Sequence, residues 1–347
     1  MNKIYVIIVS YNGLQWYDRC LGSLRQSELP LSVVVIDNAS TDGSCDYLRQ
    51  HYPEVVLLPQ DKNLGFGQAN NLGMRYAFDH GADYVFLLNQ DAWIEPSTLK
   101  DLLEVHQRHP EYGILSPIHL TVDKQHIEPL LLERIADGKT TDPHLVEDLY
   151  FATLKEVYDT QYVNAAAWLL PRKTLETVGG FDPIFFMYGE DDNYINRVLY
   201  HKMKIGICPQ IHIVHDARKD RPLYDSREHE ILMLIDYTNI NVTHAIDQDI
   251  RSHRRKAVTS LLRGRRAAYR NHIAALRILL KHRESIKTSV NTNRQIGSHW
   301  LLVFFESYII LHIPLWGRYG ASIGCCQRGV CSRATATWRS LPPIWRS

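Results

Sequence analysis

The sequence predicts an α/β protein with a doubly wound, mostly parallel sheet, flanking helices and a C-terminal helical region. Short apolar runs alternate with helical runs through the first half of the chain, as in parallel strands joined by crossover helices. Charge is divided along the chain as well. The chain has 39 basic residues (Lys and Arg) and 38 acidic residues. From Arg251 onward there are 18 basic residues and two acidic ones, so residues 1–250 contain 21 basic and 36 acidic residues. An acidic body therefore carries a basic helical region.

The apolar run Tyr84–Leu88 is the strand around which we organise this prediction, because it stops abruptly on Asn89, Gln90 and Asp91. Ligands bind at the carboxyl ends of strands in an open α/β sheet. Asp91 therefore suits a hard divalent cation that bridges phosphates, although it could instead cap a turn. The other strands expected in this half span 4–9, 33–36 and 55–58, and helices follow them at about 13–26, 44–51 and 63–80.

The second half begins with weaker periodicity. Residues 118–161 contain acidic and loop-forming residues, and we interpret them as an insertion that closes over the site. A strand over 162–170, a short helix over 172–178 and a turn at Gly179–Pro183 are expected next. Three carboxylates then open a helix over 193–201, and apolar segments at 205–208 and 212–214 lead to His215.

The basic region is predicted to be helical over 241–317. It resembles a helix that lies on an anionic membrane surface, because eight cations within 20 residues alternate with apolar side chains: Arg251, Arg254, Arg255, Lys256, Arg263, Arg265, Arg266 and Arg270. Trp300, Phe304, Phe305 and Trp316 could anchor it further on. A helical hairpin packed on the acidic body is the alternative, and both can hold together. Residues 318–347 show no periodicity and predict a disordered, dispensable tail.

Composition limits the compartment and the class of protein. No stretch reaches the roughly 18 to 20 uncharged apolar residues of a spanning helix; the nearest, Trp300–Trp316, contains Glu306, His312 and Pro314. The first three cysteines show no metal-ligand spacing, so we expect a reduced, cytoplasmic setting. We read the apolar N-terminus as the first strand and not as a signal peptide, since it lacks a small-residue cleavage site.

Two strand ends besides Asp91 suggest ligand chemistry. Asp37 follows an apolar run directly, where a carboxylate can accept hydrogen bonds from a nucleobase or ribose. The segment Gly65-Phe66-Gly67 is a weak glycine motif. It does not support a nicotinamide cofactor, because Asn70 replaces the third glycine and the motif does not follow the first strand.

Candidate catalytic groups lie in the second half. Glu190, Asp191 and Asp192 follow an aromatic run and precede an amphipathic helix, so at least one should face a pocket, although a solvated helix start is the alternative. The strand-end His215 is a candidate beside a cation. Trp168 and Tyr188 offer flat apolar faces to a ligand, with core packing equally plausible.

Four segments taken together resemble the inverting glycosyltransferases of family 2, with the GT-A fold, and their rhamnosyltransferase-like branch: VSYNG, DNASTDGS, NLGFGQANN and GGFDPIFFMYGEDD. The resemblance covers about residues 3–240. It implies a GT-A domain over 1–240, with a nucleotide-sugar-binding half at 1–117, the insertion at 118–161 and an acceptor-side half at 162–240. It also implies a nucleoside-diphosphate sugar and Mg²⁺ or Mn²⁺.

The resemblance assigns roles to particular residues. The metal-binding acidic motif matches Asn89-Gln90-Asp91, the nucleotide aspartate matches Asp37, and His215 completes the metal site with Asp91. The catalytic base falls on Asp191 with Glu190, and Trp168, Tyr188 and Asp192 belong to the acceptor side. The donor would be bound by Ser10, Tyr11, Asn12, Asp37, Asn63, Gly65, Asn70, Asn89 and Gln90. Asn89 departs from the family, which has aspartate there, and one charge fewer should weaken cation affinity.

The activity expected is the transfer of one sugar with inversion, since the QxxRW signature and flanking membrane helices of processive synthases are absent. The branch suggests dTDP-L-rhamnose as donor, and a glycan or lipid-linked saccharide as acceptor in cell-surface polysaccharide synthesis. We expect attachment to the inner face of the membrane and no nucleic-acid partner. Alternatives are a UDP-sugar donor, a non-catalytic nucleotide-sugar-binding protein or a membrane-surface adaptor.

Overall fold

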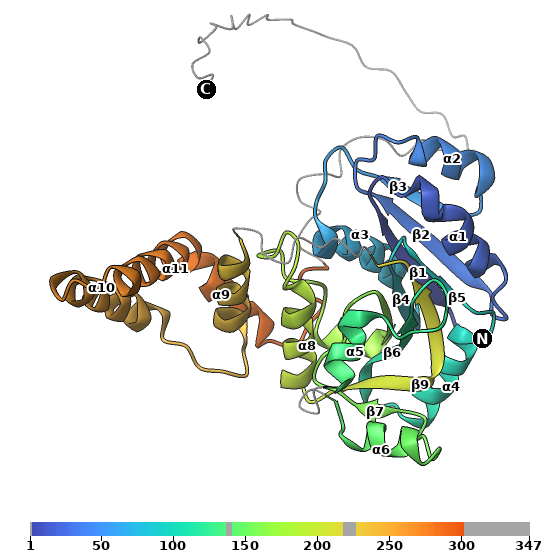
Figure 1. Ribbon diagram of the computed structural model, residues 1–347. Helices are drawn as coiled ribbons and strands as arrows, with labels where there is room; N and C mark the ends of the chain where they lie inside the picture. The colour runs from blue at the N-terminus through green and yellow to red at the C-terminus, as the bar shows by residue number, and fades with distance from the viewer. Residues whose placement is uncertain (1, 137–140, 218–226, 302–347) are drawn as a thin grey trace, which may run out of the picture. The chain divides into compact units, whose positions relative to one another are not determined.

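The computed structural model describes residues 2–136, 141–217 and 227–301. Within these ranges a nine-stranded sheet has the order β3-β2-β1-β4-β8-β6-β9-β5, and β7 pairs with β9 (Figure 1). The strands are β1 Ile4–Ser10, β2 Leu31–Asp37, β3 Val56–Pro59, β4 Tyr84–Leu88, β5 Ala92–Ile94, β6 Tyr112–Leu120, β7 Tyr158–Asp159, β8 Ala167–Pro171 and β9 Lys204–His215.

Helices fill the connections between these strands. They are η1 Leu14–Trp16, α1 Tyr17–Arg25, α2 Ser44–His51, α3 Phe66–Asp79, α4 Thr98–Arg108, α5 Pro129–Ala136, α6 His144–Tyr150, α7 Arg172–Thr177, α8 Glu190–Tyr200, α9 Glu228–Thr238, α10 Ile246–Leu262 and α11 Arg266–Asn293.

The strand directions confirm the predicted fold class. Strands β3, β2, β1 and β4 are mutually parallel, and two successive antiparallel pairings, β4 with β8 and β8 with β6, return β6 and its parallel neighbour β9 to the same direction. Only β5, β7 and β8 of the described strands run the other way. The sheet is thus mostly parallel, and its first half is wound by crossover helices on both faces.

Alternation along β1 separates two apolar layers, one on each face of the sheet. Ile7 packs in the layer that contains α3 and α8, whereas Val6 and Ile8 pack in the layer that contains α1 and α4. All three side chains are buried, which explains why the strand reads as a continuous apolar run. This rigid sheet fixes the positions of the loops at its carboxyl edge.

The second half of the sheet differs from the prediction in three places. Strand β6 was not predicted, and it continues through residue 118 to Leu120. The two short segments before His215 form one strand, β9, whose register with β6 shifts opposite Pro117 and Ile118. Strand β8 starts only at Ala167, because residues 164–166 turn, with Ala166 N donating to Asn164 O.

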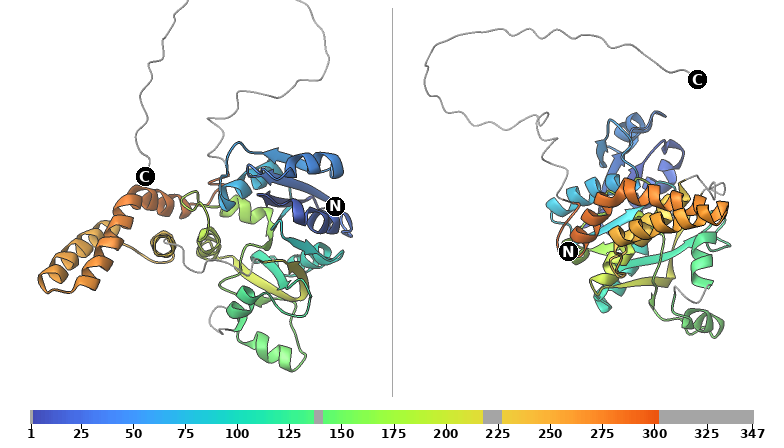
Figure 2. Two further views of the ribbon diagram at one scale, coloured as in Figure 1. Left: turned by 45° about the horizontal axis from the view of Figure 1, so that its top comes forward. Right: turned by 90° about the vertical axis from the view of Figure 1, so that its left-hand side faces the viewer.

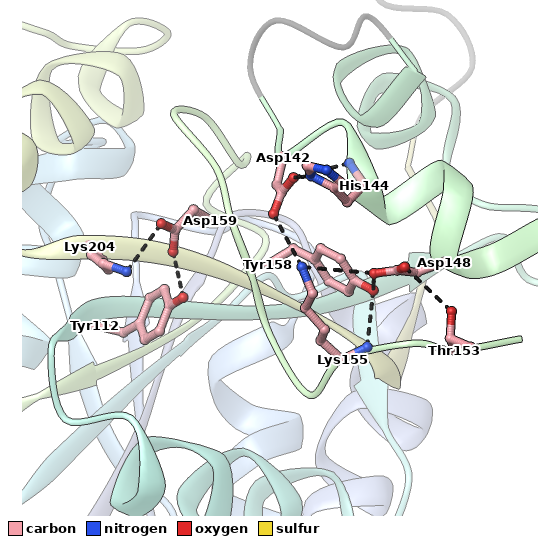
Figure 3. A network of polar contacts seen from close by, with 9 residues as sticks. All are labelled: Tyr112, Asp142, His144, Asp148, Thr153, Lys155, Tyr158, Asp159 and Lys204. Atoms are coloured by element: carbon pink, nitrogen blue, oxygen red, sulfur yellow. Dashed lines mark hydrogen bonds and ion pairs between the residues drawn. The ribbon is translucent and has the colours of Figure 1, made fainter. Parts of the chain in front are cut away.

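The predicted insertion contains α5, α6 and β7, and a polar network holds it to the sheet (Figure 3). Asp159 of β7 accepts from Tyr112 Oη at 2.5 Å and pairs with Lys204 at 3.2 Å. Tyr158 is buried and donates to Asp148 of α6 at 2.6 Å. The Asp159 contacts join the insertion to β6 and β9, and the Tyr158 bond joins β7 to α6 within it.

The C-terminal helices confirm a helical region over 246–293. Helices α10 and α11 form an antiparallel hairpin, seen in both views of Figure 2, and Leu279 and Ile286 of α11 pack with α9 in a third apolar cluster. Buried Asp182 accepts from Ser289 Oγ at 2.5 Å and from Asn293 Nδ2 at 2.7 Å. Helix α11 is thereby tied to the loop that precedes α8.

Trp300 corrects one sequence expectation. Its side chain is 8% exposed and its indole N–H donates to Asn293 Oδ1 at 2.7 Å, so it is a packing residue and not a membrane anchor. Phe304, Phe305, Trp316 and the 318–347 segment lie outside the described residues. No helix in the described part of the chain has the length and apolarity needed to cross a bilayer.

Candidate active site

The loops after β1, β2 and β4 meet at the carboxyl edge of the sheet. Gln90 joins two of them, because its Oε1 accepts from Ser10 Oγ and Tyr11 N, both at 3.0 Å, and its Nε2 donates to Tyr11 O. A side chain at Gly13 would overlap with Gln90, so glycine is required there. The Tyr11 side chain is 47% exposed and offers an aromatic face beside the edge.

The β1 and β2 loops are bound to each other directly. Asn12, with a left-handed φ of 50°, donates from its backbone N to Ser40 Oγ at 2.9 Å and accepts from Thr41 N at 2.9 Å. Asp42 accepts from Leu14 N and from Ser44 N and Oγ. Asp42 thus joins the loop after β1 to the first residue of α2.

Asp37 lies at the end of β2 and is 2% exposed. Its Oδ2 accepts from Ser40 N at 3.0 Å, but its buried Oδ1 has no hydrogen-bond partner. An unpaired buried carboxylate oxygen is costly. The atom is therefore suited to accept from an N–H or O–H of a bound ligand.

The loop of residues 63–65 is organised by Asn38, a residue that sequence reasoning missed. Asn38 Nδ2 donates to Asn63 Oδ1 and Gly65 O, and its Oδ1 accepts from Leu64 N. Gly65 has a φ of 79°, and a side chain there would overlap with the carbonyl of Phe186. The available sequence signal was that Asn38 directly follows the strand-end Asp37. This signal was weaker than the signals of the neighbouring residues.

The Phe186 contact joins the donor-side loop to the acidic helix start. Phe66 N donates to Phe186 O at 3.2 Å, and a side chain at Gly67 would touch Glu190 Cβ at 3.5 Å. The start of α3 thus lies against the start of α8. Residues more than 100 positions apart in the sequence are brought into one site.

Asp91 and His215 lie together as expected. The antiparallel pairing of β5 with β9 places Ala92 opposite His215, and Asp91 Oδ1 is 3.4 Å from His215 Nε2. Adjacent ligands of one small cation, with bonds of about 2.1 Å, lie roughly 3.0 to 3.4 Å apart. Asn89 Nδ2 is 3.4 Å from the same nitrogen. The side chains of Asp91 and His215 therefore have the separation that a shared divalent cation requires.

His119 and Glu128 form a buried group with His215 that sequence reasoning missed. One potential ligand atom from each residue lies within 4.8 Å of the others, and the Nδ1 atoms of both histidines are buried without a partner. Burial, and secondarily His215, lowers the pKa of His119 well below its usual value. The available signal was that His119, like His215, comes near the end of one of two neighbouring parallel strands.

The three carboxylates at the start of α8 have different environments. Glu190 is 6% exposed and its Oε2 has no partner, whereas Asp191 and Asp192 are partly exposed. Burial, followed by the neighbouring Asp191 charge, raises the pKa of Glu190 and of Asp192. Asp191 accepts from Tyr162 Oη at 3.1 Å. Of the three, Asp191 combines access with a donor that favours a carboxylate.

Tyr162 links the acidic cluster to the insertion. Arg134 of α5 lies 4.5 Å from the centre of the Tyr162 ring, a distance typical of a cation–π contact. Arg134 also opposes the rise in the pKa of Asp192. The insertion therefore reaches the site through α5, and a cavity of about 1030 Å³ lies beside it, lined by residues that include His126, Leu132 and His215.

The structure corrects two predicted site residues. Trp168 is 0% exposed and stacks on Phe181 at 6.2 Å between ring centres, so it is a core residue and cannot meet an acceptor. Asn70 is 2% exposed and its Nδ2 donates to Phe66 O, which makes it part of α3 packing and not a donor ligand. Tyr188, by contrast, is 50% exposed in the loop before α8.

Taken together, the edge presents a hydrogen-bond acceptor at Asp37, two potential cation ligands at Asp91 and His215, and a carboxyl group at Asp191. This arrangement can hold a nucleoside diphosphate and place a base near it. Comparisons with known proteins agree with that chemistry. The model of the family described as Glycosyl transferase family 2 matches residues 5–153.

Two relatives are similar over more than half of this chain. An N-acetylglucosaminyl-diphospho-decaprenol L-rhamnosyltransferase of Mycobacterium tuberculosis is 31% identical in an alignment of 222 residues that covers 56% of this chain and 69% of that protein. The dTDP-rhamnosyl transferase RfbF of Shigella flexneri is 25% identical over 215 residues, which are 62% and 69%. The crystal structure of S. aureus TarS 1–349 in complex with UDP-GlcNAc shares the fold, with a TM-score of 0.52 at 16% identity, over 84% of this chain and 89% of that one. The chain therefore belongs to glycosyl transferase family 2 and is similar to its rhamnosyltransferases.

Proposed function

We propose that this glycosyltransferase moves a single sugar, with inversion, from a nucleoside-diphosphate sugar to a saccharide acceptor in cell-surface polysaccharide synthesis. The observation that carries the proposal is the partly exposed Asp191, which accepts from Tyr162 Oη and lies in the sequence between two carboxyl groups whose pKa values are raised. Its neighbour Glu190 lies against the donor-side start of α3, because a side chain at Gly67 would touch Glu190 Cβ. A carboxyl group that an acceptor can reach therefore lies next to the donor side of the site.

The reaction is one in-line displacement. The acceptor hydroxyl oxygen forms a bond to the anomeric carbon while the bond from that carbon to the phosphate oxygen breaks, and the electron pair leaves with the diphosphate. Asp191 takes the hydroxyl proton. Tyr162 holds the Asp191 carboxylate through its 3.1 Å hydrogen bond, and Asp192, which is partly exposed, lies on the acceptor side with Tyr188.

Asp91 and His215 are the residues that would hold Mg²⁺ or Mn²⁺, as their 3.4 Å separation supports. When bound, such a cation neutralises the charge that develops on the leaving diphosphate. Asn89 supplies no charge. Its amide nitrogen lies 3.4 Å from His215 Nε2.

We infer that dTDP-L-rhamnose is the first donor to test and that UDP-sugars come next. The named activities of the mycobacterial and Shigella relatives support rhamnose. The unpaired Oδ1 of Asp37 can accept from the N3–H of thymine or of uracil, so it does not select between them. The first relative acts on a lipid-linked saccharide, as its name states, which supports a similar acceptor at the cytoplasmic face of a membrane.

The test compares Asp191→Asn with the matched neighbour Glu190→Gln, using dTDP-L-rhamnose and a panel of lipid-linked saccharides. Asp191→Asn should lower turnover by a factor on the order of 10² or more and leave donor binding nearly unchanged. Glu190→Gln should retain activity within a few fold. Wild-type turnover in Asp191→Asn would refute the assignment of the base.

The competing function is a nucleotide-sugar-binding protein without transfer, which Asn89 makes conceivable. Thermal shifts with dTDP-, UDP- and GDP-sugars separate the donors independently of catalysis. Binding of GDP-sugars alone would contradict both proposed donors. A donor that binds but is only hydrolysed, with every acceptor tested, would favour the binding protein.

A further inference from the structure

We propose that the free end of the α10–α11 hairpin, residues 251–270, docks this protein on an anionic lipid bilayer. The inference deepens the proposed function, because a lipid-linked acceptor would lie at such a surface. It stands on three observations: how the basic residues are paired, where acidic residues are absent, and which apolar side chains are exposed.

Two sets of basic residues in the hairpin differ in their partners. Near the α9 end, Lys281 and His282 pair with Glu230 at 2.8 and 2.5 Å. Arg283 and Lys287 pair with Asp247 at 2.5 and 2.9 Å. The Glu230 pairs join α11 to α9, and the Asp247 pairs join α11 to α10 within the hairpin. They hold the hairpin in place and are not available to a ligand.

The second set has no such partners. These side chains are exposed, and none forms an ion pair with any residue that the structure describes: Arg251, Arg254, Arg255, Lys256, Arg263, Arg265, Arg266 and Arg270. The sequence between Asp249 and Glu284 contains no acidic residue. A concentrated positive field remains at this end, and it favours an anionic surface.

Exposed apolar side chains lie within the same stretch. Val258 is 58% exposed, Leu261 57% and Leu262 80%, and the turn that follows has Gly264 at a φ of 65°. A folded domain rarely leaves adjacent leucines in water without a partner. Cations interleaved with aliphatic side chains match a bilayer, whose headgroups take the charge while its acyl boundary takes the leucines. A polyanion such as nucleic acid would match only the cations.

The experiment is cosedimentation of the full chain with vesicles of phosphatidylcholine alone or with one third phosphatidylglycerol, without substrates. Binding should require phosphatidylglycerol and weaken with salt. Since each basic residue near the surface contributes about five-fold, the triple variant Arg263→Gln, Arg265→Gln, Arg266→Gln should bind on the order of 100-fold more weakly. The double variant Leu261→Ser, Leu262→Ser should also bind more weakly.

The matched control removes three exposed cations from the sheet domain: Arg49→Gln, Lys100→Gln and Arg108→Gln. It should bind vesicles like the wild type. Equal loss in the control and in the hairpin variant would overturn the proposal, as would binding to heparin or DNA but not to vesicles. Activity on a soluble acceptor analogue is measured in parallel, so that failed docking and failed catalysis are distinguished.

Discussion

Glu190 allows a quantitative test of the acidic cluster. Burial raises its pKa from 4.5 to about 8, so the folded state binds a proton there that the unfolded state releases above pH 4.5. The stability that this proton provides is fully present below pH 4.5 and is lost as the pH rises toward 8. At about 1.36 kcal/mol per pH unit, the loss between pH 5 and 8 is at most about 4 kcal/mol.

The perturbation is Glu190→Gln, which preserves the shape of the side chain but cannot ionise. Its free energy of unfolding should fall less steeply with pH than that of the wild type, by up to about 4 kcal/mol between pH 5 and 8. Urea unfolding of both proteins at several pH values measures this difference, which belongs to the acidic cluster as a whole because Glu190 interacts with Asp191 and Asp192. Identical pH slopes would refute the buried, protonated Glu190.

Three further predictions concern the donor edge and the core. Asp91→Ala should abolish the response to Mn²⁺ and weaken donor binding, and full activity in excess chelator would contradict the cation site. Gly65→Ala should lower the melting temperature and raise the donor KM, since a φ of 79° with a ψ of 180° is almost exclusive to glycine and costs another residue about 1 to 3 kcal/mol before the overlap is counted; Gly22→Ala, in open space on α1, is its control. Trp168→Ala should cost about 3 to 5 kcal/mol of stability, whereas Tyr188→Ala should alter only the acceptor KM, and the reverse pattern would show that the two roles are exchanged.

The N-terminal half could be predicted closely because its signals are local. Each strand there is an apolar run that ends on polar residues, and α2 spans Ser44–His51 as expected. Asp37, Asn63 and Gly65 lie in loops whose spacing follows from parallel topology, and so they converge at one edge.

What could not be predicted depends on contacts between distant segments. The aromatic ring of Trp168 gives no sign of which face it meets, and only the packing of Phe181 and Tyr194 against it shows that it is core. His119 and Glu128 gain meaning only once β6 and β9 are known to be neighbours. The partial exposure of Asp191 next to buried Glu190 is likewise set by the rotation of α8.

The position of β8 in the sheet bears on how the chain folds during synthesis. Strand β8 separates β4 from β6, although it is made some 50 residues after β6, and β6 has only β8 and β9 as partners. Until residue 171 leaves the ribosome, β4 has an open edge and β6 has no neighbour at all. Such edges attract other chains. A fragment cut at residue 153, where the family match ends, would retain both open edges and should aggregate, so a minimal soluble fragment must extend at least through β9.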